Sequence, residues 1–237
     1  MPLPLNPLEW ASLAYLTLLW VGYARYARYR ACQPDGKPSL SRSLRRHREA
    51  WARRLLDREM RMTDASLLAS QERVVGFFAS TTLLLLAAVL TALTTSEQIA
   101  EITSHIPFTQ EQSTGQIEAK LALLLLILIY AFFKVTWSLR QYGFAAVVMG
   151  SAPQPTEELS PEQVQAFVNN LAKLMDSAGH DNNSCLRAYY FALAVVCWLG
   201  GSLPFLVAAT LIVLVLYNRE FGSGAVRGIE GAYIPRI

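Results

Sequence analysis

The feature that most limits what this chain can fold into is a run of 21 residues, 74–94, without a charged side chain. A helix of about 20 apolar residues is long enough to cross the hydrocarbon core of a bilayer. The whole chain of 237 residues is 53% hydrophobic and only 16% charged, against about 25% charged residues in an ordinary soluble domain. These values argue against a soluble enzyme, a disordered chain and a nucleic-acid-binding protein.

The apolar runs predict an all-α fold, a bundle of four transmembrane helices with cytosolic amphipathic helices, as one membrane domain over 1–237. The first segment has a strong helix start, with Asn6 as N-cap, Pro7 at N1 and Glu9 at N3. The predicted membrane segments are about 7–30, 72–95, 120–142 and 186–217, and the predicted cytosolic segments are 31–71 and 150–185.

Each cytosolic segment is expected to hold one helix. A basic helix opens near Ser41, and its arginines suit either packing on its own protein or a position on anionic lipid. A shorter helix begins at Ser160, with Gln163 at N3, and is expected to end at Gly179. Residues 180–183 would then cap the fourth membrane segment.

Charge asymmetry sets the expected orientation in the membrane. Residues 24–73 hold 13 of the 21 Lys and Arg residues and 6 of the 18 Asp and Glu residues. The positive-inside rule therefore places this loop in the cytosol and the N-terminus outside, in the inner (plasma) membrane. Four crossings would place the C-terminus outside as well, whereas a re-entrant hairpin at 200–204 would place it in the cytosol.

Several spaced motifs in the second half of the chain carry a resemblance to a known family. They are 139–144, 149–153, Asn183, 187–194, Trp198, Pro204 and 216–221. Together they resemble domain-of-unknown-function family 599, a family of multi-pass membrane proteins, and the resemblance runs from about the first segment to Phe221. It implies a helical membrane protein and no assigned activity.

Three arginines are expected at the cytosolic boundary of three different helices. Arg73, Arg140 and Arg187 could converge there on an anion or a lipid headgroup, because guanidinium groups offer paired donors to oxyanions. Hydrogen bonds could come from further polar side chains at this level, namely Tyr142, Asn183 and Tyr189. The alternative is that the arginines are separate anchors facing lipid headgroups.

Lys134 is the only charge well inside a predicted span. An ionisable residue in a membrane suggests a function, although lysine can also extend its amine to the nearby boundary. The apolar parts of segments two to four contain no Asp or Glu to pair with it. Gly200 and Pro204 interrupt the fourth segment, as a proline kink or as a discontinuous helix of the kind that binds substrates in transporters.

No motif in the chain indicates catalysis or a cofactor. The three cysteines and three histidines form no metal-ligand pattern, and neither a P-loop nor a G-x-S-x-G motif occurs. We therefore expect no enzymatic activity, metal, cofactor or nucleic-acid partner. The partners expected are membrane lipids, mainly anionic, with a homo-oligomer left open. The expected function is an oligomeric transport or channel component, or alternatively a membrane scaffold or accessory subunit that binds a partner through its basic helix.

Overall fold

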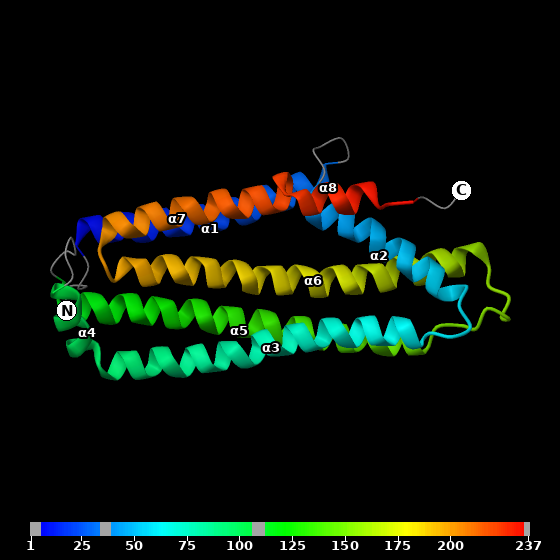
Figure 1. Ribbon diagram of the computed structural model, residues 1–237, viewed down its shortest axis with the longest axis horizontal. Coiled ribbons are helices and arrows are strands. Elements are labelled where there is room, and N and C mark those ends of the chain that lie inside the picture. The colour runs from blue at the N-terminus through cyan, green and yellow to red at the C-terminus, as the bar shows by residue number, and fades with distance from the viewer. Residues whose placement is uncertain (1–5, 34–38, 106–111, 235–237) are drawn as a thin grey trace. The chain divides into compact units, whose positions relative to one another are not determined.

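The computed structural model describes residues 6–33, 39–105 and 112–234, and these form helices and no strand (Figure 1). In chain order the elements are α1 (Pro7–Cys32), α2 (Leu40–Leu56), α3 (Met62–Thr94), α4 (Ser96–Ser104), α5 (Thr114–Gly150), α6 (Pro161–Trp198), α7 (Ser202–Tyr217), a short π-helix (Asn218–Gly222) and α8 (Gly224–Gly231). The all-helical prediction is confirmed.

The chain divides into two compact units. We call Met1–Tyr29, Ser80–Phe132 and Cys185–Asn218 the apolar unit, and Arg30–Ala79, Phe133–Ser184 and Arg219–Ile237 the basic unit. All but four of the 21 Lys and Arg residues belong to the basic unit; the exceptions are Arg25, Arg28, Lys120 and Arg187. The long helices α3, α5 and α6 each contribute one part to each unit.

Aromatic stacking organises the core of the apolar unit. The ring of Trp20 lies parallel to Phe191, with centroids 5.0 Å apart, and meets Tyr130 edge-on. Buried Trp198 stacks on Phe205 at 4.7 Å, which joins the end of α6 to the start of α7. Rings of this size bury large apolar areas, so they contribute much of the packing energy of the unit.

The chain reverses direction between α6 and α7, as Figure 1 shows. Gly201 has φ 119° and ψ 171°, a backbone conformation that only glycine adopts without strain. Pro204 lies in the first turn of α7, where proline costs no intrahelical hydrogen bond. The predicted single segment 186–217 is therefore wrong: Gly200 and Gly201 form a turn, a new helix begins at Ser202, and Pro204 lies in its first turn and does not kink an old helix.

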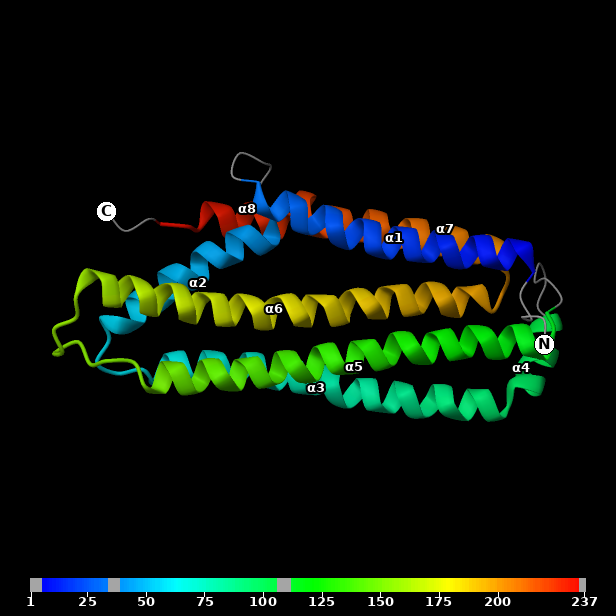
Figure 2. The ribbon, with the colours of Figure 1, turned by 180° about the vertical axis from the view of Figure 1, so that it is seen from behind.

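The helices α1 and α7 lie side by side and run in the same direction (Figure 1 and Figure 2). Tyr15 shares a hydrogen bond of 2.9 Å with Thr210, and further along both helices Tyr26 lies 6.2 Å from Tyr217. The chain therefore leaves α1 and α7 at the same end of the apolar unit. The side of the membrane on which the C-terminus lies stays a prediction, with the four-crossing and hairpin alternatives both open.

In the basic unit, α6 runs without interruption through Gly179, where the sequence predicted its end. Its start is as predicted: Ser160 accepts a hydrogen bond from the Gln163 amide at 3.2 Å, and the Gln163 side chain accepts one from the Ser160 amide at 2.8 Å. The apolar spacing of α6 continues beyond Gly179, so that residues 180–183 are helix interior and no cap. Because the two predicted helices are one continuous helix, Asp181 lies within α6, and its side chain is buried.

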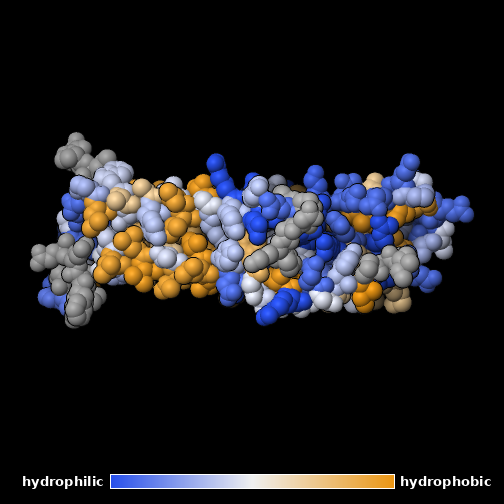
Figure 3. All heavy atoms as spheres, turned by 90° about the horizontal axis from the view of Figure 1, so that it is seen from above, coloured by the Kyte–Doolittle hydropathy of each residue, from blue (hydrophilic) through white to orange (hydrophobic). Residues whose placement is uncertain are grey.

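Among the residues that the structure describes, three stretches are long and apolar enough to cross a membrane: Met62–Thr94, Thr114–Gly150 and Ser202–Gly231. Large hydrophobic side chains such as Leu84, Leu203 and Leu18 remain exposed on the apolar unit. On the face drawn in Figure 3, hydrophobic side chains gather over α1 and α7, and hydrophilic ones over α2 and α8. An apolar surface of this extent is typical of a protein in contact with lipid.

Candidate functional site

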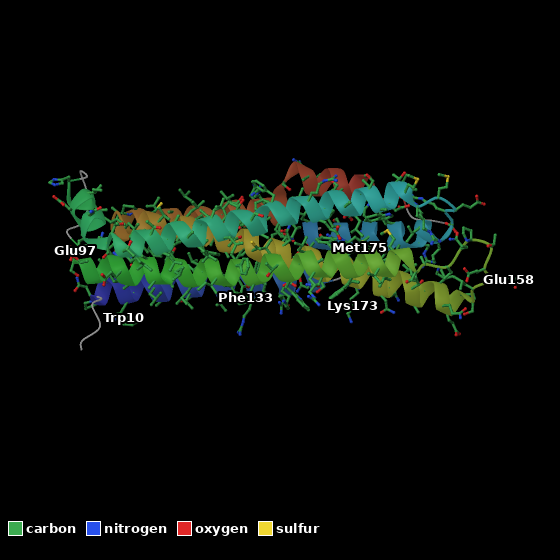
Figure 4. The ribbon with its side chains drawn as sticks, turned by 90° about the horizontal axis from the view of Figure 1, so that it is seen from below. Trp10, Glu97, Phe133, Glu158, Lys173 and Met175 are labelled. Carbon is green, nitrogen blue, oxygen red and sulfur yellow. The ribbon has the colours of Figure 1, made fainter. Side chains whose placement is uncertain are left out.

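The basic unit contains a cavity of about 510 Å³ beside α2. Four elements line it, and its polar side chains are mainly basic or aromatic. The lining residues are Leu44, His47, Arg48, Ala50, Trp51, Arg54, Arg58, Leu68, Gln71, Tyr142 and Met175. Figure 4 shows Met175 on the side of α6 toward α2, whereas Lys173 points away from it. We call this cavity the arginine pocket.

One wall of the pocket is held by an ion pair between α2 and α6. Arg48 donates to Asp176 at 2.5 Å, and both side chains are about four-fifths buried, with 21% and 22% exposed. The guanidinium lies so close to α6 that a Cβ on Gly179 would be 2.7 Å from Arg48 Nη2. Gly179 therefore lets Arg48 reach Asp176 one helical turn away, which gives this mid-helix glycine a packing role.

A second wall is fixed by Asp64, which is fully buried at the start of α3. Its Oδ1 accepts a hydrogen bond from Trp51 Nε1 at 2.6 Å and one from Arg58. Both donors line the pocket. The carboxylate thus orients the indole and the guanidinium together.

Basic side chains line the pocket, and the carboxylates that pair with them, Asp64 and Asp176, are not among the lining residues. Among the lining residues that the structure describes there are three arginines and one histidine, and no Asp or Glu. Burial raises the pKa of the Asp176 carboxyl above its ordinary value, although the hydrogen bond from Arg48 acts in the opposite direction. The Arg48–Asp176 and Arg58–Asp64 ion pairs each use Nη1 of the arginine. A guanidinium has five N–H donors in all, so one ion pair does not use its full donor capacity. The arrangement is suited to binding an oxyanion.

Of the residues predicted to bind an anion, Tyr142 is buried and lines the arginine pocket. Arg73 and Arg140 are exposed on α3 and α5, outside the lining set, and Arg140 lies over the ring of Phe144. Asn183 lies on α6 in the basic unit. The other two predicted residues, Arg187 and Tyr189, belong to the apolar unit, where Tyr189 shares a hydrogen bond with Thr82. Their convergence stays a prediction.

Lys134 has a carboxylate partner that the sequence analysis missed. Its Nζ lies 2.7 Å from Asp181 Oδ1, and Gln141 donates to Asp181 Oδ2 at 2.7 Å. One turn from Lys134, buried Ser138 donates to the Ala178 carbonyl at 2.7 Å. Asp181 lies outside the predicted segments two to four, within which a partner was sought, and it reaches Lys134 because residues 180–183 continue α6 and do not cap a new helix.

The apolar unit contains another buried ion pair that the sequence did not suggest. Lys120 Nζ lies 2.8 Å from Glu9 Oε1, with side chains only 2% and 8% exposed. Lys120 also donates to Gln112 at 2.5 Å, and Gln112 donates to the Leu199 carbonyl at 2.8 Å. Glu9 was assigned to helix capping alone, and it does accept a hydrogen bond from the Asn6 amide at 3.2 Å. This network joins the beginnings of α1 and α5 to the turn before α7.

The fold and the pocket define a class: a helical protein with helices long and apolar enough to cross a membrane, and with an arginine-lined cavity in its basic unit. A family model describes residues 11–225 of the chain. The chain belongs to this family, the proteins of unknown function DUF599, so the resemblance noted from the sequence is confirmed. Neither a curated protein nor a solved structure was found to match the chain.

Proposed function

We propose that this protein is an integral protein of the inner (plasma) membrane that binds a phosphate-bearing anion in the arginine pocket on the cytosolic side. The observation that carries the proposal is the pocket itself, with three arginines and one histidine on its surface. Guanidinium groups bind phosphate oxygens through paired, charge-assisted hydrogen bonds. The cytosolic side is inferred because most of the basic residues belong to this unit.

The size and lining of the pocket favour an organic phosphate. Its volume of about 510 Å³ lies in the range of sites for small organic ligands, about 300–1,000 Å³. Leu44, Leu68 and Met175 provide apolar surface beside the arginines. A lipid headgroup with the beginning of its acyl chains would use both the basic and the apolar surface, and a soluble organic phosphate would use chiefly the basic surface.

The test compares the binding of inorganic phosphate, glycerol 1-phosphate, dioctanoyl phosphatidic acid and uncharged dioctanoylglycerol to the full chain in mild detergent. We expect binding of the phosphate compounds and none of dioctanoylglycerol. Tighter binding of the phosphatidic acid than of glycerol 1-phosphate would identify a lipid source, and equal binding a soluble one. If no phosphate compound binds, the proposal is wrong.

A matched pair of variants separates the pocket from general charge. Arg54 lines the pocket, whereas its neighbour Arg53 contacts Gln165 and is not a lining residue. Each of Arg54→Gln and Arg53→Gln removes one positive charge from α2. We expect Arg54→Gln to weaken binding roughly fivefold, equivalent to about 1 kcal/mol for an exposed ionic contact, and Arg53→Gln to leave it unchanged. Equal effects would indicate non-specific attraction.

A second candidate function, an oligomeric transport or channel component, is supported by the Lys134–Asp181 pair. The pair includes a residue of the stretch Thr114–Gly150, which is apolar enough to cross a membrane, and ionisable residues at such positions commonly mark transport pathways. Native mass spectrometry of the protein in mild detergent tests this candidate. A monomer would argue against it, because a single copy of this size offers few helices for a pathway.

A further inference from the structure

We propose that the C-terminal segment 229–234 acts as a latch on the arginine pocket and competes with its ligand. This inference rests on the proposed function. The segment contacts two residues of the pocket lining through its main chain. His47 Nε2 lies 2.7 Å from the Ile229 carbonyl oxygen, and Arg54 Nη2 donates to the Ile234 carbonyl oxygen at 3.4 Å. Two side chains that would serve an anion are therefore directed at the chain's own carbonyl groups.

Side chains of the same segment anchor it to α2. Glu230 accepts hydrogen bonds from Arg46 Nη1 at 2.7 Å and from Ser43 Oγ at 2.5 Å. The ring of Tyr233 meets the His47 ring edge-on at 5.6 Å and lies under the Arg46 guanidinium at 6.0 Å. The segment is thus held in one position against the basic face of α2.

The contacts that hold the latch closed are weak enough to break reversibly. The Arg46 and Glu230 side chains are 38% and 37% exposed, and ion pairs in contact with solvent contribute little stability. Ser223 caps α8 through the Val226 amide, and Val226 is buried, so opening of the latch would unwind residues 229–231 at the end of α8 while its start stays packed. When a binding-competent state is only partly populated, the apparent dissociation constant rises by the inverse of its fraction. Loosening the latch should therefore tighten phosphate binding without any change in the pocket.

The test measures the affinity of the full chain for dioctanoyl phosphatidic acid and for glycerol 1-phosphate. Glu230→Gln removes the ion pair with Arg46 and weakens the contact with Ser43. The matched control is Glu220→Gln, because Glu220 is a carboxylate of the same tail that accepts from the Ser41 hydroxyl at 2.7 Å, outside the pocket lining. Because both changes remove one negative charge near α2, a difference in affinity between the two variants reports the latch contacts and not long-range electrostatic attraction of the ligand.

We expect Glu230→Gln to bind the phosphate ligand roughly fivefold more tightly and Glu220→Gln to bind it as the unchanged chain does. Tyr233→Ala, which keeps every charge, should act in the same direction as Glu230→Gln and serves if that variant does not fold. Unchanged or weaker binding in both latch variants would overturn the latch and leave the proposed function in place. Absence of binding in the unchanged chain would overturn the proposed function and the latch with it.

Discussion

The Lys134–Asp181 pair allows a sharp test of the packing of α6 against α5. Asp181 is 9% exposed and Lys134 is 34% exposed, with 2.7 Å between Nζ and Oδ1. Lys134→Met removes the positive charge from a buried carboxylate that still accepts a hydrogen bond from Gln141. Breaking a buried pair costs about 3–5 kcal/mol, and we reduce this to about 2 kcal/mol because the lysine side chain is only partly buried.

The double-mutant cycle uses Lys134→Met, Asp181→Asn and their combination. The amide oxygen introduced by Asp181→Asn would still accept from Gln141, and Lys134 is only partly buried, so we expect this change to cost about 1 kcal/mol. The double variant has no unpaired charge and should be less destabilised than the sum of the single changes by about 2 kcal/mol.

The assay is unfolding in mixed micelles of mild detergent and dodecyl sulfate, followed by tryptophan fluorescence. Lys173→Met is the control, because Lys173 is an exposed lysine of α6 in the same unit, and its loss should change the unfolding free energy by less than about 0.5 kcal/mol. The reasoning is refuted if Lys134→Met costs no more than Lys173→Met, or if the two single effects add in the double variant.

Three further predictions concern single side chains. Gly179→Ala should lower the unfolding free energy by about 1 kcal/mol, because displacing Arg48 from Asp176 costs about 2 kcal/mol and the higher helix propensity of alanine restores about 1 kcal/mol. The control is Gly143→Ala, which has no atom within 4 Å of the added Cβ and should not be destabilising. Gly201→Ala should cost about 1–3 kcal/mol through backbone strain, and a melting temperature equal to that of the unchanged chain would contradict this. Burial raises the pKa of Asp176 in the folded protein above its unfolded value of about 3.9. Protonated Asp176 therefore contributes its full stability at a pH below the unfolded pKa, and this contribution is lost as the pH rises through the folded pKa. Asp176→Asn should flatten melting temperature against pH in that window, and an unchanged slope would count against the assignment.

Much of the secondary structure was predictable because it depends on neighbours in the sequence. The helices α1 and α6 begin after Asn6 and Ser160 as predicted, and there the Asn6 amide donates to Glu9 and the Gln163 amide donates to Ser160, since a helix start depends only on the next three residues. The uncharged run 74–94 lies in α3, because backbone groups in an apolar environment must be satisfied within a helix. The apolar and basic segments could likewise be told apart by composition.

The candidate site was less predictable, because contacts between distant residues define it. Tyr142 was singled out from the sequence, but His47, Arg48 and Arg54 were seen only as members of a basic helix. Nothing local to α2 indicates that Asp176 lies opposite Arg48 or that the tail reaches His47. These pairings depend on which helix faces α2, and the sequence spacing of a single helix does not contain that information.

By itself, the sequence determined that this chain forms apolar helices able to cross a membrane, with its positive charge concentrated in one part. The tertiary structure decided what the ambiguous glycines do. Gly179 lies inside a helix, where Arg48 occupies the space of its missing side chain, whereas Gly201 lies at the break before α7 and has a positive φ. Both outcomes suit glycine equally well in a local sequence, since glycine tolerates helix and turn alike. Packing selects between them, and with that selection it places Asp181 beside Lys134 and returns the C-terminal segment to α2.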